Sequence, residues 1–223
     1  MRQTALLMIN PLGIVVGLAA EARIARSLGE VAAGGGTAAG AEAAAERLAA
    51  GGARALLSFG LAGALDPALR PGALVIPRAV LAGGEIRPVD PEMLAALGGP
   101  TADLILGESE LAKSAGAKRQ LRQRTGAAAL DLESGAVARA AHRHGLPFAV
   151  LRAICDPAER ALPPAALVAL DRKGAIRIVR VFTSVVAAPS QLPALFALAR
   201  DAAAARRALI RRVAELGDRL PLV

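Results

Sequence analysis

The sequence predicts an α/β fold of three layers, in which helices flank both faces of a central, mixed but mostly parallel sheet. Short apolar runs typical of buried strands alternate along the chain with segments of helical periodicity. Residues 130–157 show this pattern most clearly, because a strand ends at Leu130, a helix follows, and 148–154 is a second apolar strand. No internal repeat or linker is visible. We therefore expect a single domain over residues 1–223, with a divergent helical C-terminal part at about 158–223.

The N-terminal quarter contains two strand predictions and two helix predictions. Residues 13–18 are apolar and are predicted to form the first strand, and 19–28 continue with the spacing of a helix. Residues 38–50 are rich in Ala and Glu, which favour helices, and a Gly-Gly pair ends this segment. The apolar run 54–59 is predicted to be the next strand.

The middle of the chain is punctuated by glycine and proline. Residues 60–67, with the sequence GLAGALDP, are predicted to form a glycine loop. Residues 73–81 are predicted to be a strand with Pro77 at an edge or bend, since proline cannot donate a ladder hydrogen bond. Residues 90–97 begin with an Asp cap and a proline in the first turn, which predicts a short helix, and 102–106 is another strand.

The second half continues the alternation. Residues 113–124 are polar and basic and are predicted to be a helix at the surface, and 127–130 is a short strand. The next helix opens at 133–134 and stops at Gly145, before the strand 148–154. Further helices are predicted in the C-terminal part, at 163–171, 176–186 and 191–216.

The charge of the chain is basic and is concentrated near the C-terminus. The sequence has 27 Lys and Arg against 19 Asp and Glu, and residues 172–219 alone hold ten basic and three acidic side chains. Nucleic acid is not expected as a partner, because no aromatic residues interleave with these arginines and no binding motif is present. An anionic membrane surface remains an alternative to an ordinary solvated helix face.

Cysteine content and apolar runs indicate the compartment. The single cysteine excludes an internal disulfide framework and fits a reducing cytoplasm. The apolar N-terminal run could pass for a signal peptide, but Asn10, Pro11 and Gly13 interrupt it, so a strand feeding a helix explains it better. No apolar run reaches the roughly 18–20 residues of a membrane span. We expect a cytoplasmic protein, with peripheral contact to the inner membrane as an open alternative.

Three carboxylates are predicted to lie where strands end. Glu21 follows the first strand, Glu133 follows the strand 127–130, and Asp156 follows the strand 148–154. Each of them alone would be an ordinary cap or a solvated charge. Ligands of α/β sheets bind at the carboxyl ends of strands, so the three together, beside the glycine loop, indicate a binding site.

Other residue types give weaker indications. Residues 60–63 lack the G-x-G-x-x-G pattern and no helix opens after them, so a dinucleotide site is not expected; a structural turn and a backbone approach to a small ligand both remain open. His142 and His144 have no partners at ligand spacing, so no metal site is expected. Cys155 has no nearby histidine to activate it and is interpreted as a small wall residue rather than a nucleophile.

Four short motifs lie at these junctions: GLAAEA at 17–22, GLAGAL at 60–65, DLE at 131–133 and RAICD at 152–156. They resemble the G-x-x-x-E-x, G-S-A-G-G-L, D-M-E and R-A-I-S-D elements of the purine nucleoside phosphorylase/nucleosidase superfamily, in particular its methylthioadenosine/adenosylhomocysteine nucleosidase branch. The resemblance covers about residues 12–157, and the last two motifs at this spacing are specific. The remaining segments DPAERALPPAAL and PSQLPALFALARDA are similar to the hopanoid-associated members, usually called hopanoid-associated phosphorylases.

The resemblance implies a purine N-glycosidase with three catalytic carboxylates. Asp156 would hydrogen-bond or protonate purine N7, so that adenine leaves as a neutral group. Glu133 would accept hydrogen bonds from the ribose 2′- and 3′-hydroxyls, and Glu21 would orient the attacking water. Arg152 would position the Asp156 loop or be a structural partner. Contacts with the substrate are carried over to Gly60, Leu61, Ala62, Gly63, Leu132, Arg152 and Cys155.

Several positions depart from the family pattern. Leu61 replaces the serine of the glycine loop and Ser58 stands where phosphorylases carry an arginine, so binding of a free phosphate dianion is poorly supported. Cys155 replaces the serine before the catalytic aspartate, and Leu132 replaces the methionine of D-M-E. The aromatic residue that stacks on the base has no counterpart. Stacking would be aliphatic, or come from Phe59 or from a partner chain.

The function expected from the resemblance is the release of adenine from adenosylhopane in hopanoid biosynthesis, which would leave a ribosyl- or phosphoribosyl-hopane. The alternatives are a methylthioadenosine/adenosylhomocysteine nucleosidase and a phosphate-dependent nucleoside phosphorylase. A nucleoside- or membrane-surface-binding protein without activity is a further alternative from another class. The substrate would be an adenosine-type nucleoside with an apolar 5′ substituent. No cofactor or metal is expected. We expect the protein to form a homo-oligomer, dimeric or larger.

Overall fold

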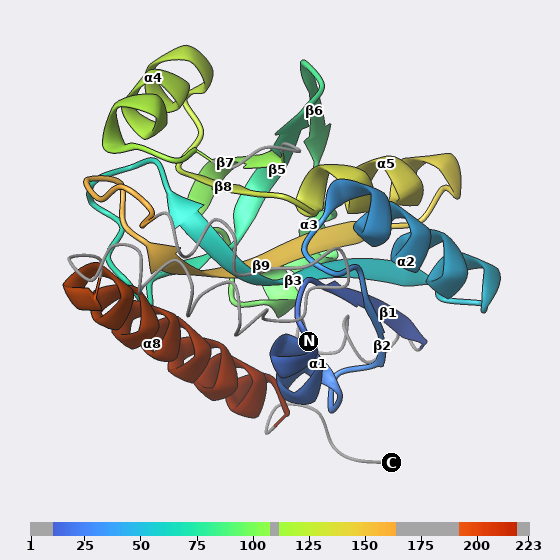
Figure 1. Cartoon of the computed structure of the whole chain (residues 1–223). Coiled ribbons are helices and arrows are strands. Elements are labelled where there is room, and N and C mark those ends of the chain that lie inside the picture. The colour runs from blue at the N-terminus through green and yellow to red at the C-terminus, as the bar shows by residue number, and fades with distance from the viewer. Residues whose placement is uncertain (1–10, 108–111, 164–191, 218–223) are drawn as a thin grey trace.

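The computed structural model describes residues 11–107, 112–163 and 192–217, and within these residues nine strands form one sheet (Figure 1). The strands are β1 (Leu12–Val16), β2 (Glu30–Ala33), β3 (Ala55–Ala64), β4 (Leu74–Val75), β5 (Pro77–Ala82), β6 (Glu85–Pro88), β7 (Ala102–Gly107), β8 (Ala129–Asp131) and β9 (Phe148–Asp156). Their order is β2-β1-β3-β8-β7-β5-β6, and β9 pairs with β3 and β4.

The sheet is mixed and mostly parallel, as the sequence predicts. The pairs β1–β2, β1–β3, β3–β9, β5–β7 and β7–β8 are parallel, whereas β3–β8, β4–β9 and β5–β6 are antiparallel. The end of β3 pairs with two strands at once, because Gly63 lies opposite Leu130 of β8 and Asp156 of β9. The ends of β3, β8 and β9 therefore meet at one place, where a ligand site of an α/β sheet is expected.

Helices cover both faces of the sheet, which confirms the predicted three-layer arrangement. The helices are α1 (Ala19–Ala25), α2 (Ala38–Ala50), α3 (Pro91–Ala96), α4 (Ala115–Thr125), α5 (Ser134–Arg143) and α8 (Leu192–Gly217). Figure 1 shows α2 and α5 side by side over one face, and α1 with the long α8 over the other. Helix α4 lies near β7 and β8 at the end of the sheet.

Small side chains bring α5 close to the sheet. The helical spacing that predicts α5 also predicts its buried face, and the structure confirms this face for Ala136, Val137, Ala140 and Ala141. At its first turn, the backbone of Gly135 touches Gly107 at the end of β7, so that a Cβ on Gly107 would lie 2.3 Å from the Gly135 nitrogen. This contact fixes the start of α5, and with it Glu133, against the sheet.

Helix α8 is one continuous helix of 26 residues that packs on the sheet through one face. The buried residues of this face are Asp201, Ala205, Ala208, Leu209, Val213 and Leu216. Among the described parts of the chain, no helix combines the length and the apolar character needed to cross a membrane. The helices predicted at 163–171 and 176–186 lie outside the described residues, apart from Pro163 itself.

Two predictions of local structure are corrected, and two strands were not predicted. The glycine run predicted as a loop over 60–67 belongs to β3 as far as Ala64, because pairing with β8 and β9 holds it extended. The single strand predicted at 73–81 divides at Ile76 into β4 and β5, which pair with different neighbours. Strands β2 and β6 lie at the two edges of the sheet, and none of their residues is fully buried, so neither has the apolar pattern that predicts a strand.

Candidate active site

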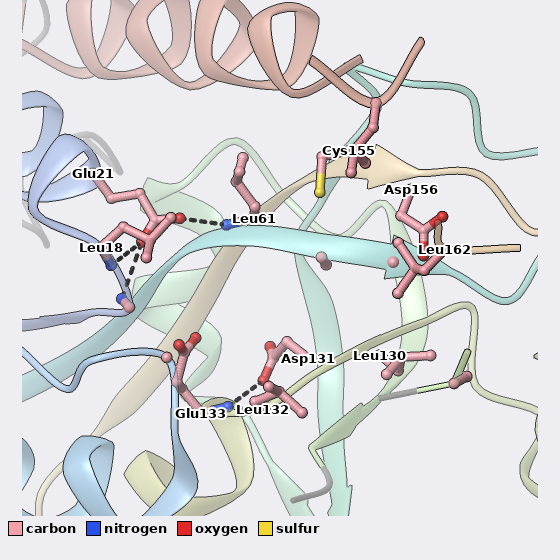
Figure 2. A pocket seen from close by; sticks show the side chains of 16 residues that line it. Leu18, Glu21, Leu61, Leu130, Asp131, Leu132, Glu133, Cys155, Asp156 and Leu162 are labelled. Carbon is pink, nitrogen blue, oxygen red and sulfur yellow. Dashed lines mark hydrogen bonds between the residues drawn. The ribbon is translucent and has the colours of Figure 1, made fainter. Parts of the chain in front are cut away.

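The carboxyl ends of β1, β3, β8 and β9 surround a cavity of about 230 Å³ (Figure 2). Leu162, which follows β9, and Leu198 of α8 complete its largely apolar wall. The residues predicted from the sequence that line it are Glu21, Leu61, Ala62, Gly63, Leu132, Glu133, Cys155 and Asp156. Gly60 and Arg152, also predicted to contact the substrate, do not line the cavity and lie behind its wall.

A buried guanidinium joins the carboxylates at one end of the cavity. The Arg152 residue is 1% exposed, and its Nη1 lies 2.8 Å from Glu133 Oε2. Its Nε lies 3.0 Å from Asp131 Oδ2, and its Nη2 donates to Ser58 Oγ at 2.6 Å. Burial alone would lower the pKa of Arg152, but the surrounding carboxylates, Asp131 first, raise it above its ordinary value. Arg152 is therefore a charged group that holds carboxylates in place from behind the wall.

Backbone amides hold Glu21 at the start of α1. Its Oε2 accepts hydrogen bonds from the N–H groups of Gly17 at 3.0 Å and Leu18 at 2.8 Å, and its Oε1 accepts from Leu61 N–H at 3.2 Å. Burial raises the pKa of Glu21, while the charge of Arg152 and these amides lower it. The carboxylate is thus fixed between the ends of β1 and β3, facing the cavity (Figure 2).

Two glycines make room for these charged groups. A Cβ at Gly60 would lie 2.8 Å from Arg152 Nη1 and 2.9 Å from Glu21 Cδ. A Cβ at Gly17 would lie 2.4 Å from Glu133 Oε1. Real Cβ atoms do not approach other atoms so closely, so a side chain at either position would displace a charged partner. The glycines of these motifs therefore serve the packing of buried charges.

Glu133 stands at the N-cap position of α5 and reaches back to the cavity. Asp131 Oδ1 accepts hydrogen bonds from the N–H groups of Glu133 at 2.8 Å and Ser134 at 2.7 Å, which fixes the turn between β8 and α5. Burial raises the pKa of Glu133 to about 7; Arg152 opposes this shift and the neighbouring carboxylates add to it.

Asp156 lies at the opposite end of the cavity from Glu21 and Glu133 (Figure 2). Its Oδ2 forms an ion pair with Lys118 Nζ at 2.7 Å. Burial raises the pKa of Asp156, and the hydrogen bond and charge of Lys118 lower it. A buried carboxyl group with a raised pKa is suited to donate a proton.

Lys118 is a charged residue of the site that the sequence does not predict. Residues 113–124 are predicted to be a surface helix, but the Lys118 side chain on α4 is fully buried. The only signal is its spacing, since Lys118 is three residues before Leu121, which packs against the smaller apolar cluster of the protein. A lysine on that helix face must have a buried partner, but the sequence does not say which one.

Two further predictions concern the wall of the cavity. Burial, with the charge of Asp156, raises the pKa of the Cys155 thiol to about 12, so the thiol stays protonated and Cys155 is a wall residue. Of the three alternatives for stacking on a base, the structure disfavours Phe59, because Phe59 is fully buried in the core and does not line the cavity. None of the described residues that line the cavity is aromatic, and its apolar side chains include Leu132 and Leu162.

The histidines lie away from the cavity. His144 Nε2 contacts Glu46 Oε2 at 2.5 Å on the surface of the α2–α5 layer, and His142 is exposed. In the ranges that the structure describes, no three His, Cys, Asp or Glu side chains are grouped to hold a metal ion.

The chain is similar to known proteins over most of its length. The model of the Phosphorylase superfamily matches residues 31–187, whereas a comparison with curated proteins gives no match. A 5′-methylthioadenosine/S-adenosylhomocysteine nucleosidase from Neisseria meningitidis, solved with methylthio-immucillin-A, has 17% identity and a TM-score of 0.64, over 91% of this chain and 96% of that one.

Two further solved structures are equally similar. An S-adenosylhomocysteine nucleosidase from Streptococcus pyogenes, in complex with 5-methylthiotubericidin, has 16% identity and a TM-score of 0.64, over 95% of this chain and 97% of that one. The futalosine hydrolase of Helicobacter pylori has 15% identity and a TM-score of 0.64, over 94% and 99%. At such low identity these structures establish a shared fold.

Proposed function

Because the chain belongs to the phosphorylase superfamily, we propose that it is an N-glycosidase that removes adenine from an adenosine carrying an apolar 5′ substituent. Water is the second substrate. The observation that carries this proposal is the placement of Asp156 at one end of a single cavity and of Glu21 and Glu133 toward the other.

This placement fits the charges that develop when an N-glycosidic bond breaks. The bonding electrons move to the purine, and Asp156 supplies the proton that lets adenine leave as a neutral base. The ribose becomes positively charged, and the Glu133 carboxylate stabilises it through hydrogen bonds from the sugar hydroxyls. Glu21, held by three backbone amides, orients the water that attacks the sugar carbon. The non-enzymatic alternative gives no account of why these charged groups are buried together.

The cavity wall supports hydrolysis rather than phosphorolysis. A phosphate dianion needs donors and positive charge, but none of the described lining residues is Arg or Lys, and the acidic residues Glu21, Asp131, Glu133 and Asp156 all line the cavity. Ser58, at the position of the phosphorylase arginine, is fully buried and bonded to Arg152 and Ser134. Leu61 offers only an apolar side chain.

The finer proposal is that the 5′ substituent is a hopanoid lipid, so that the substrate is adenosylhopane. It rests on the sequence similarity of the C-terminal part to hopanoid-associated members, and it is supported by Leu198, through which this part borders the cavity. A cavity of about 230 Å³ does not hold a hopane together with a nucleoside, so the lipid would extend out of it.

A methylthioadenosine/adenosylhomocysteine nucleosidase is the second candidate, and it fits the findings at least as well. Similar structures bind analogues with small 5′ groups: methylthio-immucillin-A in the Neisseria meningitidis protein and a butyl-thio analogue in the Helicobacter pylori protein. The apolar wall of the cavity would accept such a thioether directly.

One experiment separates these possibilities. The purified protein is incubated with adenosylhopane and with methylthioadenosine, each with and without phosphate, and adenine release is followed while the sugar product is weighed by mass spectrometry. We expect adenine and a free sugar whether or not phosphate is present. A sugar 1-phosphate would show phosphorolysis, and release from methylthioadenosine alone would favour the second candidate. No release from either substrate would contradict the proposed function.

A further inference from the structure

The ammonium group of Lys118 makes all of its contacts with the segment that carries Asp156. Its Nζ lies 2.7 Å from Asp156 Oδ2, and it donates to the carbonyl oxygens of Pro157 at 2.8 Å and Arg160 at 2.9 Å. An ammonium group has three donors, and here each of them has an acceptor. Since the side chain has no exposed surface, no solvent competes for these contacts.

We propose that Lys118 is a positioning residue for the reaction: it binds Oδ2 of Asp156, so that the acidic proton is carried by the other carboxyl oxygen, Oδ1. This inference rests on the proposed function. Its reason is chemical, because an ammonium group donates hydrogen bonds and accepts none. A protonated Asp156 therefore cannot turn its O–H toward Lys118. In the described part of the chain no hydrogen bond occupies Oδ1, so its proton can point to the purine.

In the proposed reaction, the proton that Asp156 gives to the purine is replaced by a proton from water. The bond between the sugar carbon and the purine breaks, its electron pair goes to the purine, and the proton on Asp156 Oδ1 passes to N7. Asp156 is then an anion paired with the Lys118 cation. Water adds to the sugar carbon and loses a proton, which restores the acid.

Burial raises the pKa of Asp156, and Lys118 is the group that lowers this pKa most. The charged and titratable groups around this carboxyl group are Lys118 from α4, Arg160 from the segment after β9, Asp201 from α8, and the thiol of Cys155. The charge of Arg160 lowers the pKa of Asp156 and the charge of Asp201 raises it, so their effects on Asp156 are opposed. The two side chains also form an ion pair with one another. When Lys118 is removed, the main group that lowers the pKa of Asp156 is lost, and the pKa should rise because of burial.

The test compares wild type with Lys118→Met, Lys118→Gln and Lys118→Arg. The first measurement is the pH profile of adenine release from whichever adenosyl substrate the wild type cleaves. The second is the titration of the Asp156 carboxyl carbon by NMR, with the signal assigned by its loss in Asp156→Asn. For Lys118→Met we expect kcat to fall roughly 10–100-fold with a smaller change in KM, because the Asp156 carboxyl group is no longer held in one orientation.

The pH dependence distinguishes a positioning role from mere support of the fold. A general acid works only below its pKa, so in Lys118→Met both the alkaline fall of activity and the NMR midpoint should move to higher pH. Lys118→Arg keeps the charge and should return both midpoints toward wild type. Lys118→Gln keeps donors without the charge; it should behave like Lys118→Met, and it serves as the test if Lys118→Met does not fold.

A reduced kcat with both midpoints unmoved would overturn the proposal, and so would wild-type kcat in Lys118→Met. Absence of adenine release by the wild type would instead contradict the proposed function. In that case the NMR titration still decides about Lys118: a midpoint that stays at the wild-type pH in the uncharged variants refutes its influence on Asp156, and a midpoint at higher pH supports it.

Discussion

At the scale of single residues, the candidate site consists of charged groups withdrawn from water, and Asp156 is the one that would act as the acid. In Asp156→Asn the amide cannot deliver a proton, so we expect turnover to fall roughly 10²–10⁴-fold. The side chain keeps its shape, and circular dichroism should show an unchanged fold. Adenine release at the wild-type rate would remove Asp156 from the mechanism.

Gly17 shows how a residue without a side chain can control the site. In Gly17→Ala the new methyl group would lie 2.4 Å from Glu133 Oε1, so Glu133 must move away from its position beside the cavity. We expect kcat to fall roughly 10²-fold, because small displacements of a catalytic group have large effects.

The matched control for this variant is Gly116→Ala on α4. There the nearest atom is 3.9 Å from the added carbon, and the position is helical, so activity should be unchanged and stability slightly higher. If Gly17→Ala is as active as Gly116→Ala, Glu133 does not need its observed position.

The raised pKa of Glu133 predicts that kcat/KM depends on pH. It must be ionised to accept hydrogen bonds from both sugar hydroxyls, and burial raises its pKa to about 7. For an acid whose ionised form is active, kcat/KM should rise as the pH increases through about 7. In Glu133→Gln this rise should disappear, and kcat should fall more than the affinity for substrate, because the contact strengthens as the sugar becomes charged. A change in KM alone would show that Glu133 only binds.

At the scale of helices and strands, most elements follow from local pattern, and those that do not depend on distant partners. The central strands β1, β3 and β9 are apolar runs buried on both faces, which the sequence displays directly. The edge strands β2 and β6 lack such a run, so nothing local marks them. The glycine run at the end of β3 is typical of a loop, and only its pairing partners make it a strand.

The site, too, has parts that follow from local sequence pattern and parts that depend on distant partners. The carboxylates were predictable, because each lies at or within a few residues of the end of an apolar strand, and the ends of neighbouring strands lie close together. The partners of those carboxylates were not. Lys118 is 38 residues from Asp156 in the sequence, and no local pattern pairs them. The burial of Arg152 behind the wall likewise depends on three strands meeting, and only the structure distinguishes a supporting residue from one that lines the cavity.

Helix α8 is tied to the segment after β9 by an ion pair that we expect to support the site. Asp201 is 2% exposed, and its Oδ2 lies 2.5 Å from Arg160 Nη1. Asp201→Ala should lower the free energy of unfolding by about 1–3 kcal/mol, because Arg160 loses a charged hydrogen-bond partner. Since the Arg160 carbonyl binds Lys118, kcat should fall as well.

Chemical denaturation measures the loss in Asp201→Ala, and Arg70→Ala provides the control. Arg70 pairs with Glu159 in the same segment at 3.3 Å, but both side chains are more than half exposed. An exposed pair contributes little, so Arg70→Ala should change the stability by less than about 1 kcal/mol. Equal effects of the two substitutions would mean that burial of Asp201 is not what matters.

At the scale of the whole molecule, α8 combines two surfaces with different roles. Its buried face packs on the sheet, and Leu198 reaches the cavity. Its other face carries exposed apolar side chains, Phe196 at 73% and Ile210 at 52%, together with the exposed arginines Arg207 and Arg211. Apolar and basic side chains exposed on one helix are typical of contact with an anionic membrane, which would also be the source of a lipid-linked substrate.

We therefore expect the protein to sediment with anionic vesicles at low salt and to be released by high salt, because each basic residue near the surface contributes on the order of 1 kcal/mol that salt screens. Replacing Arg207 and Arg211 with Gln should weaken this binding. The control replaces Arg119 and Arg124, two exposed arginines of α4, which removes the same charge elsewhere. If both pairs weaken binding equally, the attraction comes from net charge alone. If neither does, or if no vesicle binds the protein, the arginines of α8 are an ordinary solvated face and the substrate must reach the cavity from solution.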